Sequence, residues 1–197
     1  MPTKTIGVTY ASLMTLGPEM AFATAEQARD LGYSSFWTAE TTGPEAFSTL
    51  AAISGRTPGL DLGTGVLALQ LRTPLLATMG AATLQSLAPE RTIHLGVGIS
   101  SPVVVSRWHG ASYGTRPLAQ VRDYLNLAAA CLSGDPVDHD GEFYVCKGFR
   151  LGVRLGERRP KLVLGALNEK MLRLAGELAD GVLLNYLPAS AVQWCVE

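Results

Sequence analysis

The chain has 197 residues, of which 47% are hydrophobic and 17% are charged, so it can build a large core and does not read as a disordered or fibrous sequence. Lysine and arginine number 16 against 17 acidic residues, for a net charge of -1. This balance provides no basic surface for nucleic acid or anionic lipid, so neither is expected as a partner.

The three cysteines, Cys131, Cys146 and Cys195, form no CxxC motif, and their odd number argues against a disulfide framework. The three histidines are too far apart for a metal-ligand pattern. The N-terminus lacks a signal-peptide pattern, and no apolar run approaches the length of a membrane span. We therefore expect a cytoplasmic protein with reduced thiols, no metal and no membrane segment.

Strand–helix units recur about every thirty residues in the first half of the chain. The predicted strands span Thr5–Tyr10, Ser34–Thr38, about Leu60–Leu69 and Thr92–Val97. Each of the first three is followed by a helix that opens at a proline, namely Pro18, Pro44 and Pro74. The second helix should stop near Ser54-Gly55. The apolar periodicity predicts which residues of each helix share a side. The inner face of the first helix should carry Ala21, Ala25, Ala28 and Leu31, and that of the second Phe47, Leu50 and Ala51. In the third helix, the residues on one side are Leu76, Met79, Thr83 and Leu87.

The segment from about residue 100 to 160 interrupts this rhythm. It contains a helix pattern over about Pro117–Leu132, and Asp138–Gly141 predicts a turn between two short strands, the second at Phe143–Val145. Gly148–Arg159 predicts a loop. Because insertions at the carboxyl ends of barrel strands commonly carry substrate-binding parts, we expect such an insertion within one domain of residues 1–197.

The stretch Lys161–Leu184 gives the clearest single unit. A buried strand over Lys161–Leu164 precedes a helix capped by Asn168, and a second strand follows Asp180-Gly181, which makes a βαβ unit of a parallel sheet. The small residues of the Gly165–Asn168 turn would let an anion such as a phosphate approach backbone N–H groups at the helix N-terminus. A plain βα turn with small residues for packing remains the alternative.

Six strands alternate strictly with helices along the chain. A closed (β/α)8 barrel usually needs ~250 residues, so the chain supplies about six of eight units. From the residues alone, the fold is either an incomplete α/β barrel or an open doubly wound sheet. An incomplete barrel has two unpaired edge strands, so we expect a homodimer that seals them, or else a poorly stable and inactive chain.

Several stretches, in the expected order, resemble the bacterial-luciferase-like superfamily of flavin- and F420-dependent oxidoreductases: AEQARDLGYSSFWTAE, LDLGTGVLALQLRTPLLATMGAATLQSLAPER, HLGVGIS and AGELADGV. The similarity is greatest to the F420-dependent branch. It implies a TIM-barrel-type (β/α)8 fold and hydride transfer between C5 of the deazaflavin and a small organic substrate. An FMN-dependent monooxygenase and an inactive, truncated cofactor-binding remnant are the two alternatives.

The resemblance also implies residues of the second strand. Glu40 matches an acidic residue that ends this strand beside the cofactor ring, and Thr38 precedes it as a cofactor contact. Thr41 stands where relatives often have His, so Glu40 is the single candidate for proton handling, provided that burial raises its pKa. An exposed loop carboxylate is the alternative for Glu40.

Three further places are implied in the same way. Gly65-Val66 matches the position of a non-proline cis peptide under the ring, although Gly63 and Gly65 could merely relieve crowding. Gly98 borders the cofactor cleft, and no third glycine follows Gly96-Val97-Gly98 to complete a dinucleotide fingerprint. The remaining implied contacts are backbone N–H groups that bind the cofactor's phosphate: Gly165, Ala166 and Leu167.

Overall fold

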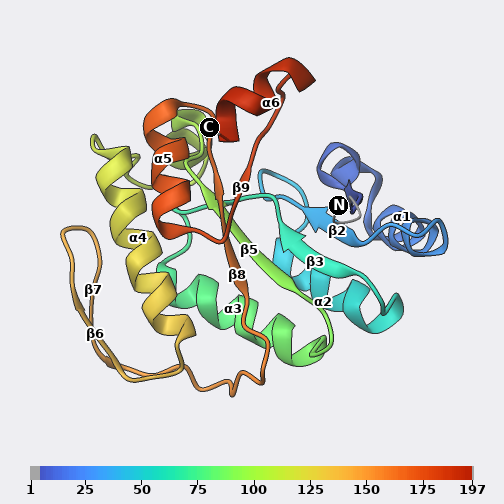
Figure 1. The fold of residues 1–197 in the computed structure, drawn as a ribbon, viewed down its shortest axis with the longest axis horizontal. Helices are drawn as coiled ribbons and strands as arrows, with labels where there is room; N and C mark the ends of the chain where they lie inside the picture. The colour runs from blue at the N-terminus through green and yellow to red at the C-terminus, as the bar shows by residue number, and fades with distance from the viewer. Residues whose placement is uncertain (1–4, 197) are drawn as a thin grey trace.

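The computed structural model describes residues 5–196, which form a parallel sheet with helices around it and a small separate hairpin (Figure 1). The sheet contains β1 (Gly7–Thr9), β2 (Ser35–Thr38), β3 (Asp61–Thr64), β4 (Leu67–Ala68), β5 (Ile93–Gly98), β8 (Lys161–Gly165) and β9 (Gly181–Leu183). The α-helices are α1 (Pro18–Asp30), α2 (Ala46–Arg56), α3 (Pro74–Leu87), α4 (Pro117–Leu132), α5 (Glu169–Leu178) and α6 (Ala189–Val196). The sequence did not reveal a 3-10 helix over Ala11–Leu16 or a π-helix over Val103–Trp108.

The order of the strands decides between the two architectures that the sequence left open. All pairings in the sheet are parallel, and the order β1-β2-β3-β5-β8-β9 is the chain order, with β4 also pairing with β5. A doubly wound sheet reverses its order at a switch point, and this sheet does not. The fold is therefore an α/β half-barrel, and right-handed crossovers place its helices on one face, where α2, α3, α4 and α5 follow one another (Figure 1).

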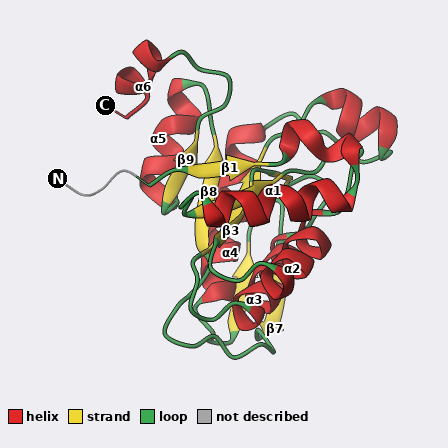
Figure 2. Ribbon diagram, turned by 90° about the vertical axis from the view of Figure 1, so that its right-hand side faces the viewer, coloured by secondary structure: helices red, strands yellow, loops and turns green. Residues whose placement is uncertain are grey.

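Alternate residues of each strand serve the two faces of the sheet. Phe36, Leu95 and Leu164 are fully buried in the core between the sheet and the helices. Their neighbours Trp37 and Val163 lie on the opposite face, which we call the inner face. Figure 2 shows the strands edge-on behind α1, α2 and α3. The inner face is the one that a closed barrel would enclose.

Helix ends and faces differ from the prediction at several places. Helix α1 buries its three predicted alanines, but Leu31 is 75% exposed because the helix ends one residue earlier. Helix α2 begins at Ala46 rather than Pro44, because the Glu45 side chain caps it by accepting from the Ser48 N–H at 2.7 Å. It ends at Arg56, after Ser54-Gly55.

The side of α3 predicted from its leucines turns out to face outward. The core side of α3 consists mainly of small residues such as Ala77 and Ala81, because the helix lies close to its neighbours. A Cβ on Gly80, for instance, would lie 2.7 Å from the Phe47 ring of α2. The larger side chains of Leu76 and Met79 therefore point away from the sheet.

The long segment between β5 and β8 contains α4 and the hairpin of β6 (Val137–Asp140) and β7 (Val145–Phe149). The predicted turn at Asp138–Gly141 was placed too early, since Asp138–Asp140 belong to β6. Asp123 of α4 sets the real turn by accepting from the Phe143 and Tyr144 N–H groups at 2.6 and 3.0 Å. The predicted third strand is split into β3 and β4.

Candidate functional site

Two residues that are 99 positions apart in the sequence, Val66 and Gly165, meet at the carboxyl ends of the strands. A Cβ on Gly165 would lie 3.4 Å from both Val66 methyl carbons, and a Cβ on Gly98 would lie 3.0 Å from Val66 Cγ2. Gly98 and Gly165 also adjoin, since that Cβ on Gly98 would be 3.7 Å from Gly165 Cα. The peptide bond between Gly65 and Val66 is cis, as the resemblance implied.

Three glycines without side chains gather at this end of the inner face. Gly65, Gly98 and Gly165 carry no side chain, and the Val66 side chain packs beside Gly98 and Gly165; we call these four residues the glycine floor. A Cβ on Gly65 would lie 3.2 Å from Leu183 Cδ1 and 3.6 Å from the Trp37 ring, so these apolar groups border the floor. Because these glycines carry no side chain and the groups around them are apolar, the residues suit the aromatic ring of a flavin or deazaflavin.

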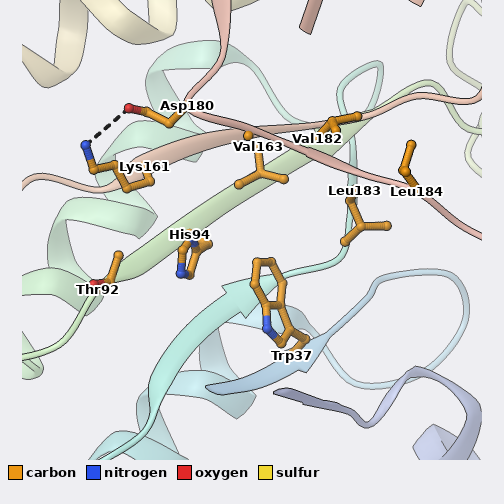
Figure 3. A pocket seen from close by; sticks show the side chains of 10 residues that line it. Trp37, Thr92, His94, Lys161, Val163, Asp180, Val182, Leu183 and Leu184 are labelled. Atoms are coloured by element: carbon orange, nitrogen blue, oxygen red, sulfur yellow. Dashed lines mark hydrogen bonds and ion pairs between the residues drawn. The ribbon is translucent and has the colours of Figure 1, made fainter. Parts of the chain in front are cut away.

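A cavity of about 590 Å³ lies on the inner face, and it shares Trp37 and Leu183 with the border of the floor while Thr92, Lys161 and Asp180 line it at the amino ends of the strands (Figure 3). The indole of Trp37 and the imidazole of His94 stack against each other on its wall, with 4.8 Å between ring centroids. Burial lowers the pKa of His94, although the carboxylates of Asp61 and Asp180 act in the opposite direction. The cavity therefore presents a neutral imidazole and an indole. Strand alternation in SFWT could have identified Trp37 as an inward residue.

Glu40, the predicted acid, is held by two donors at the end of β2. Its Oε1 atom accepts from the Ala46 N–H at 3.0 Å and from Arg72 Nη2 at 3.1 Å. Arg72 also donates to Glu45 at 2.7 Å, so one guanidinium joins two carboxylates. The Glu40 side chain is only 24% exposed, which differs from the alternative of an exposed loop carboxylate.

Thr38 lies two residues earlier and is fully buried. Its carbonyl oxygen accepts from the Gly65 N–H at 2.6 Å, which ties β2 to the glycine floor. Its hydroxyl has no hydrogen-bond partner among the described residues. The predicted contact residue is therefore joined to the site through its backbone.

The turn after β8 is less open than the sequence suggested. The Ala166 N–H donates to the Leu183 carbonyl oxygen at 3.2 Å, so the sheet already uses one of the three predicted phosphate donors. Leu167 has an exposed side chain, and its N–H has no backbone partner within residues 5–196. Asn168 caps α5 as predicted, accepting from the Met171 N–H at 3.1 Å. An anion at this turn would therefore rely on Leu167 and the first turn of α5.

Gln70 is a polar residue of this region that the sequence reading did not single out. It follows β4, where the Leu69 N–H donates to the Gly98 carbonyl oxygen at 3.1 Å. Gln70 Oε1 accepts from the Ser100 N–H at 3.5 Å, while Nε2 is buried and has no partner in the described part of the chain. A buried amide with an unused donor next to Gly98 can bind an acceptor of a ligand.

Residues 5–196 offer neither a metal site nor a membrane-spanning helix. No group of three His, Cys, Asp or Glu side chains there is arranged to hold a metal ion. Within the same residues, no helix is both long and apolar enough to cross a membrane.

Comparison with known proteins agrees with this geometry. A coenzyme F420-dependent oxidoreductase of Mycobacterium tuberculosis is 34% identical over 177 residues, which cover 83% of this chain and 50% of that protein. The chain spans about half the length of the curated relatives it matches.

Solved structures show the same fold at lower identity. An F420-dependent secondary alcohol dehydrogenase, solved with an F420-acetone adduct, superposes with a TM-score of 0.85 at 18% identity, covering 95% of this chain and 60% of that one. A monooxygenase of Streptomyces bottropensis gives 0.84 at 20% identity, covering 98% and 63%. Residues 8–197 match the profile of the luciferase-like monooxygenases, and the chain therefore belongs to the luciferase-like monooxygenase family.

Proposed function

We propose that this chain is the cofactor-binding part of an F420-dependent oxidoreductase that acts on a small organic substrate. The observation that carries the proposal is the glycine floor, where Gly65, Gly98 and Gly165 gather around Val66 at the carboxyl ends of neighbouring strands. The F420-dependent relatives support this choice of cofactor. F420, when bound, exchanges a hydride at C5 of its deazaflavin ring.

Different residues around the floor bind different parts of the cofactor. The floor supports the flat ring, and Trp37 and Leu183 border it and exclude water from one edge. Gln70 Nε2 donates a hydrogen bond to an acceptor on the ring or the substrate. The Leu167 N–H and the first turn of α5 bind the cofactor's phosphate, with the dipole of α5 favouring the anion.

Glu40 handles the proton that accompanies hydride transfer in this proposal. It lies at the end of β2, two residues from the Thr38 carbonyl that binds the Gly65 N–H. Arg72 and the Ala46 N–H hold one of its oxygen atoms, Oε1, and thereby fix the orientation of the carboxylate.

An FMN-dependent monooxygenase is the second candidate, because a monooxygenase superposes on this chain as well as an F420 enzyme does. The glycine floor suits either ring, so cofactor identity separates the two. A remnant that binds a cofactor without turnover is the third. We further propose a cytoplasmic homodimer, in keeping with three free cysteines in the described residues.

Titration of the purified 197-residue chain with F420 and, separately, with FMN tests the proposal. We expect F420 to bind at least ten times more tightly than FMN, as measured by the change in cofactor fluorescence. Tighter binding of FMN would favour the monooxygenase. Binding of neither cofactor would refute both proposals, and F420 binding without hydride transfer to any substrate tested would favour the remnant.

A further inference from the structure

A second cavity lies at the amino ends of the strands, opposite the ends that carry the glycine floor. It measures about 370 Å³ and is lined by two loops, residues 57–60 after α2 and residues 88–91 after α3. Leu62 of β3 also lines it, whereas Gly65 of the floor follows the other end of the same strand. The volume falls in the range of small-molecule sites, and the cavity is separate from the proposed cofactor site.

The two loops begin in the same way, so they can be compared residue by residue. Thr57 ends α2 with φ -130° and ψ 69°, and Ala88 ends α3 with φ -131° and ψ 64°. Each donates its N–H to the carbonyl oxygen four residues earlier, at 2.7 and 3.0 Å, and each is followed by a proline. Because Ala88 ends its helix without a hydroxyl, this helix end does not require the hydroxyl of Thr57.

A glutamine side chain holds the loop after α3. Gln85 Nε2 donates to the Ala88 and Arg91 carbonyl oxygens at 3.2 and 2.9 Å. The Arg91 N–H also donates to the Ala88 carbonyl oxygen, at 3.1 Å. One primary amide therefore binds two carbonyl groups of this loop.

The loop after α2 lacks such an amide. Ser54 stands where α3 has Gln85, three residues before the end of the helix, and its short side chain donates to the Ala51 carbonyl oxygen at 2.7 Å. Within residues 5–196, no hydrogen bond reaches the carbonyl oxygens of Thr57 and Leu60. The Thr57 side chain is 1% exposed, and its hydroxyl has no partner in the same part of the chain. A buried polar group without a partner is costly, and the residues that carry these three groups line the cavity.

The remaining walls of the cavity suit an uncharged ligand with an apolar body. The leucines among them are Leu60, Leu62 and Leu87. The two charged residues at the cavity, Glu90 and Arg91, are both exposed and opposite in sign. Their charges oppose each other, so the cavity favours neither an anion nor a cation.

We propose that this cavity is a binding site for a small neutral molecule with a primary carboxamide group and a short apolar body. The amide N–H groups donate to the Thr57 and Leu60 carbonyl oxygens, as the Gln85 amide does in the neighbouring loop. The amide oxygen accepts from the Thr57 hydroxyl, and the apolar body lies against the leucines. The site does not depend on the proposed function at the other end of the strands.

Titration of the purified 197-residue chain with benzamide, which joins a primary amide to an apolar ring, tests this proposal. We expect saturable binding by ligand-observed NMR, at least ten times tighter than that of benzoate or toluene, because these two lack the amide N–H donors. Thr57→Val removes the hydroxyl and should weaken benzamide binding about fivefold. Thr57→Ser keeps the hydroxyl and should bind as the wild type does.

Ser54→Gln tests the location of the site. It gives α2 the amide that α3 has at Gln85, so the protein's own side chain should fill the cavity and abolish benzamide binding. Ser86→Gln is the matched control, since Ser86 also donates to the carbonyl oxygen three residues earlier at 2.7 Å but lies outside the cavity, and it should leave binding unchanged. Circular dichroism checks that each variant is folded.

Three outcomes would overturn the proposal. The first is that benzamide does not bind, or binds no more tightly than toluene or benzoate. The second is that Thr57→Val and Ser54→Gln both bind benzamide as the wild type does. The third is that Gly165→Ala weakens benzamide binding, which would place benzamide at the glycine floor. Titration with F420 is read separately, so loss of the proposed function leaves this site standing.

Discussion

Gly165→Ala is the sharpest test of the glycine floor, because it adds a single methyl group where the cofactor ring is expected. The φ angle of Gly165 is not positive, so alanine fits its backbone, and the new Cβ would lie 3.4 Å from Val66, at the near edge of ordinary contact. We therefore expect the variant to fold at least as stably as the wild type, since alanine in a strand is favoured over glycine by about 0.5–1 kcal/mol.

The effect on cofactor binding follows from the contacts that the methyl group removes. A flat ring of about 14 heavy atoms gains ~0.15 kcal/mol per atom in contact with the floor, or about 2 kcal/mol in total. A methyl group that lifts the ring by up to ~1 Å forfeits about half of this, which weakens binding by ~1 kcal/mol, roughly fivefold. If the ring cannot shift, a steric clash with the new methyl group would weaken cofactor binding further.

Gly176→Ala in α5 is the matched control for this substitution. A Cβ on Gly176 would meet nothing within 4 Å, and the position is exposed, so alanine should stabilise the helix by ~1 kcal/mol and leave binding unchanged. The F420 dissociation constant and the melting temperature of both variants are compared with those of the wild type. Equal affinity of Gly165→Ala and the wild type would refute the floor as the ring's support.

Three further predictions concern other parts of the chain. Glu40→Gln should lower kcat at least tenfold with unchanged F420 affinity. Glu45→Gln changes the other carboxylate bound by Arg72 and should leave kcat unchanged. If both variants lost kcat equally, the role of Glu40 would be to anchor Arg72. Because burial lowers the pKa of His94, the unfolded state takes up its proton first, so the free energy of unfolding should fall as the pH drops below roughly 6.5. Urea unfolding at pH 7.5 and 5.5 should show a smaller fall for His94→Asn than for His109→Asn, which changes an exposed histidine. Burial raises the pKa of the Cys131 thiol to about 11, so iodoacetamide should modify the half-buried Cys146 first, as read by peptide mass spectrometry, and the reverse order would contradict the burial of Cys131.

The meeting of Gly65-Val66 with Gly165 was predictable because it follows from topology alone. Parallel strands in a barrel-type sheet end at one edge, so residues just past neighbouring strands converge whatever their separation in sequence. The cap at Asn168 was predictable for a similar reason, since the hydrogen bond spans three residues. The partners of Glu40 were not, because Arg72 lies 32 residues away and reaches it through the packing of two loops.

The third helix shows where periodicity stops being informative. A spacing of three and four residues tells which side chains share a side of a helix, and Leu76, Met79 and Leu87 do share one. It does not tell whether that side meets the sheet or another molecule, because both surroundings favour apolar groups. The size of the side chains carries the missing information: most buried residues of α3, such as Ala77 and Ala81, are small, and Leu84 is the only leucine of this helix that is fully buried. The positions of the small residues therefore identify the side of α3 that meets the sheet, which the spacing of its large apolar residues does not.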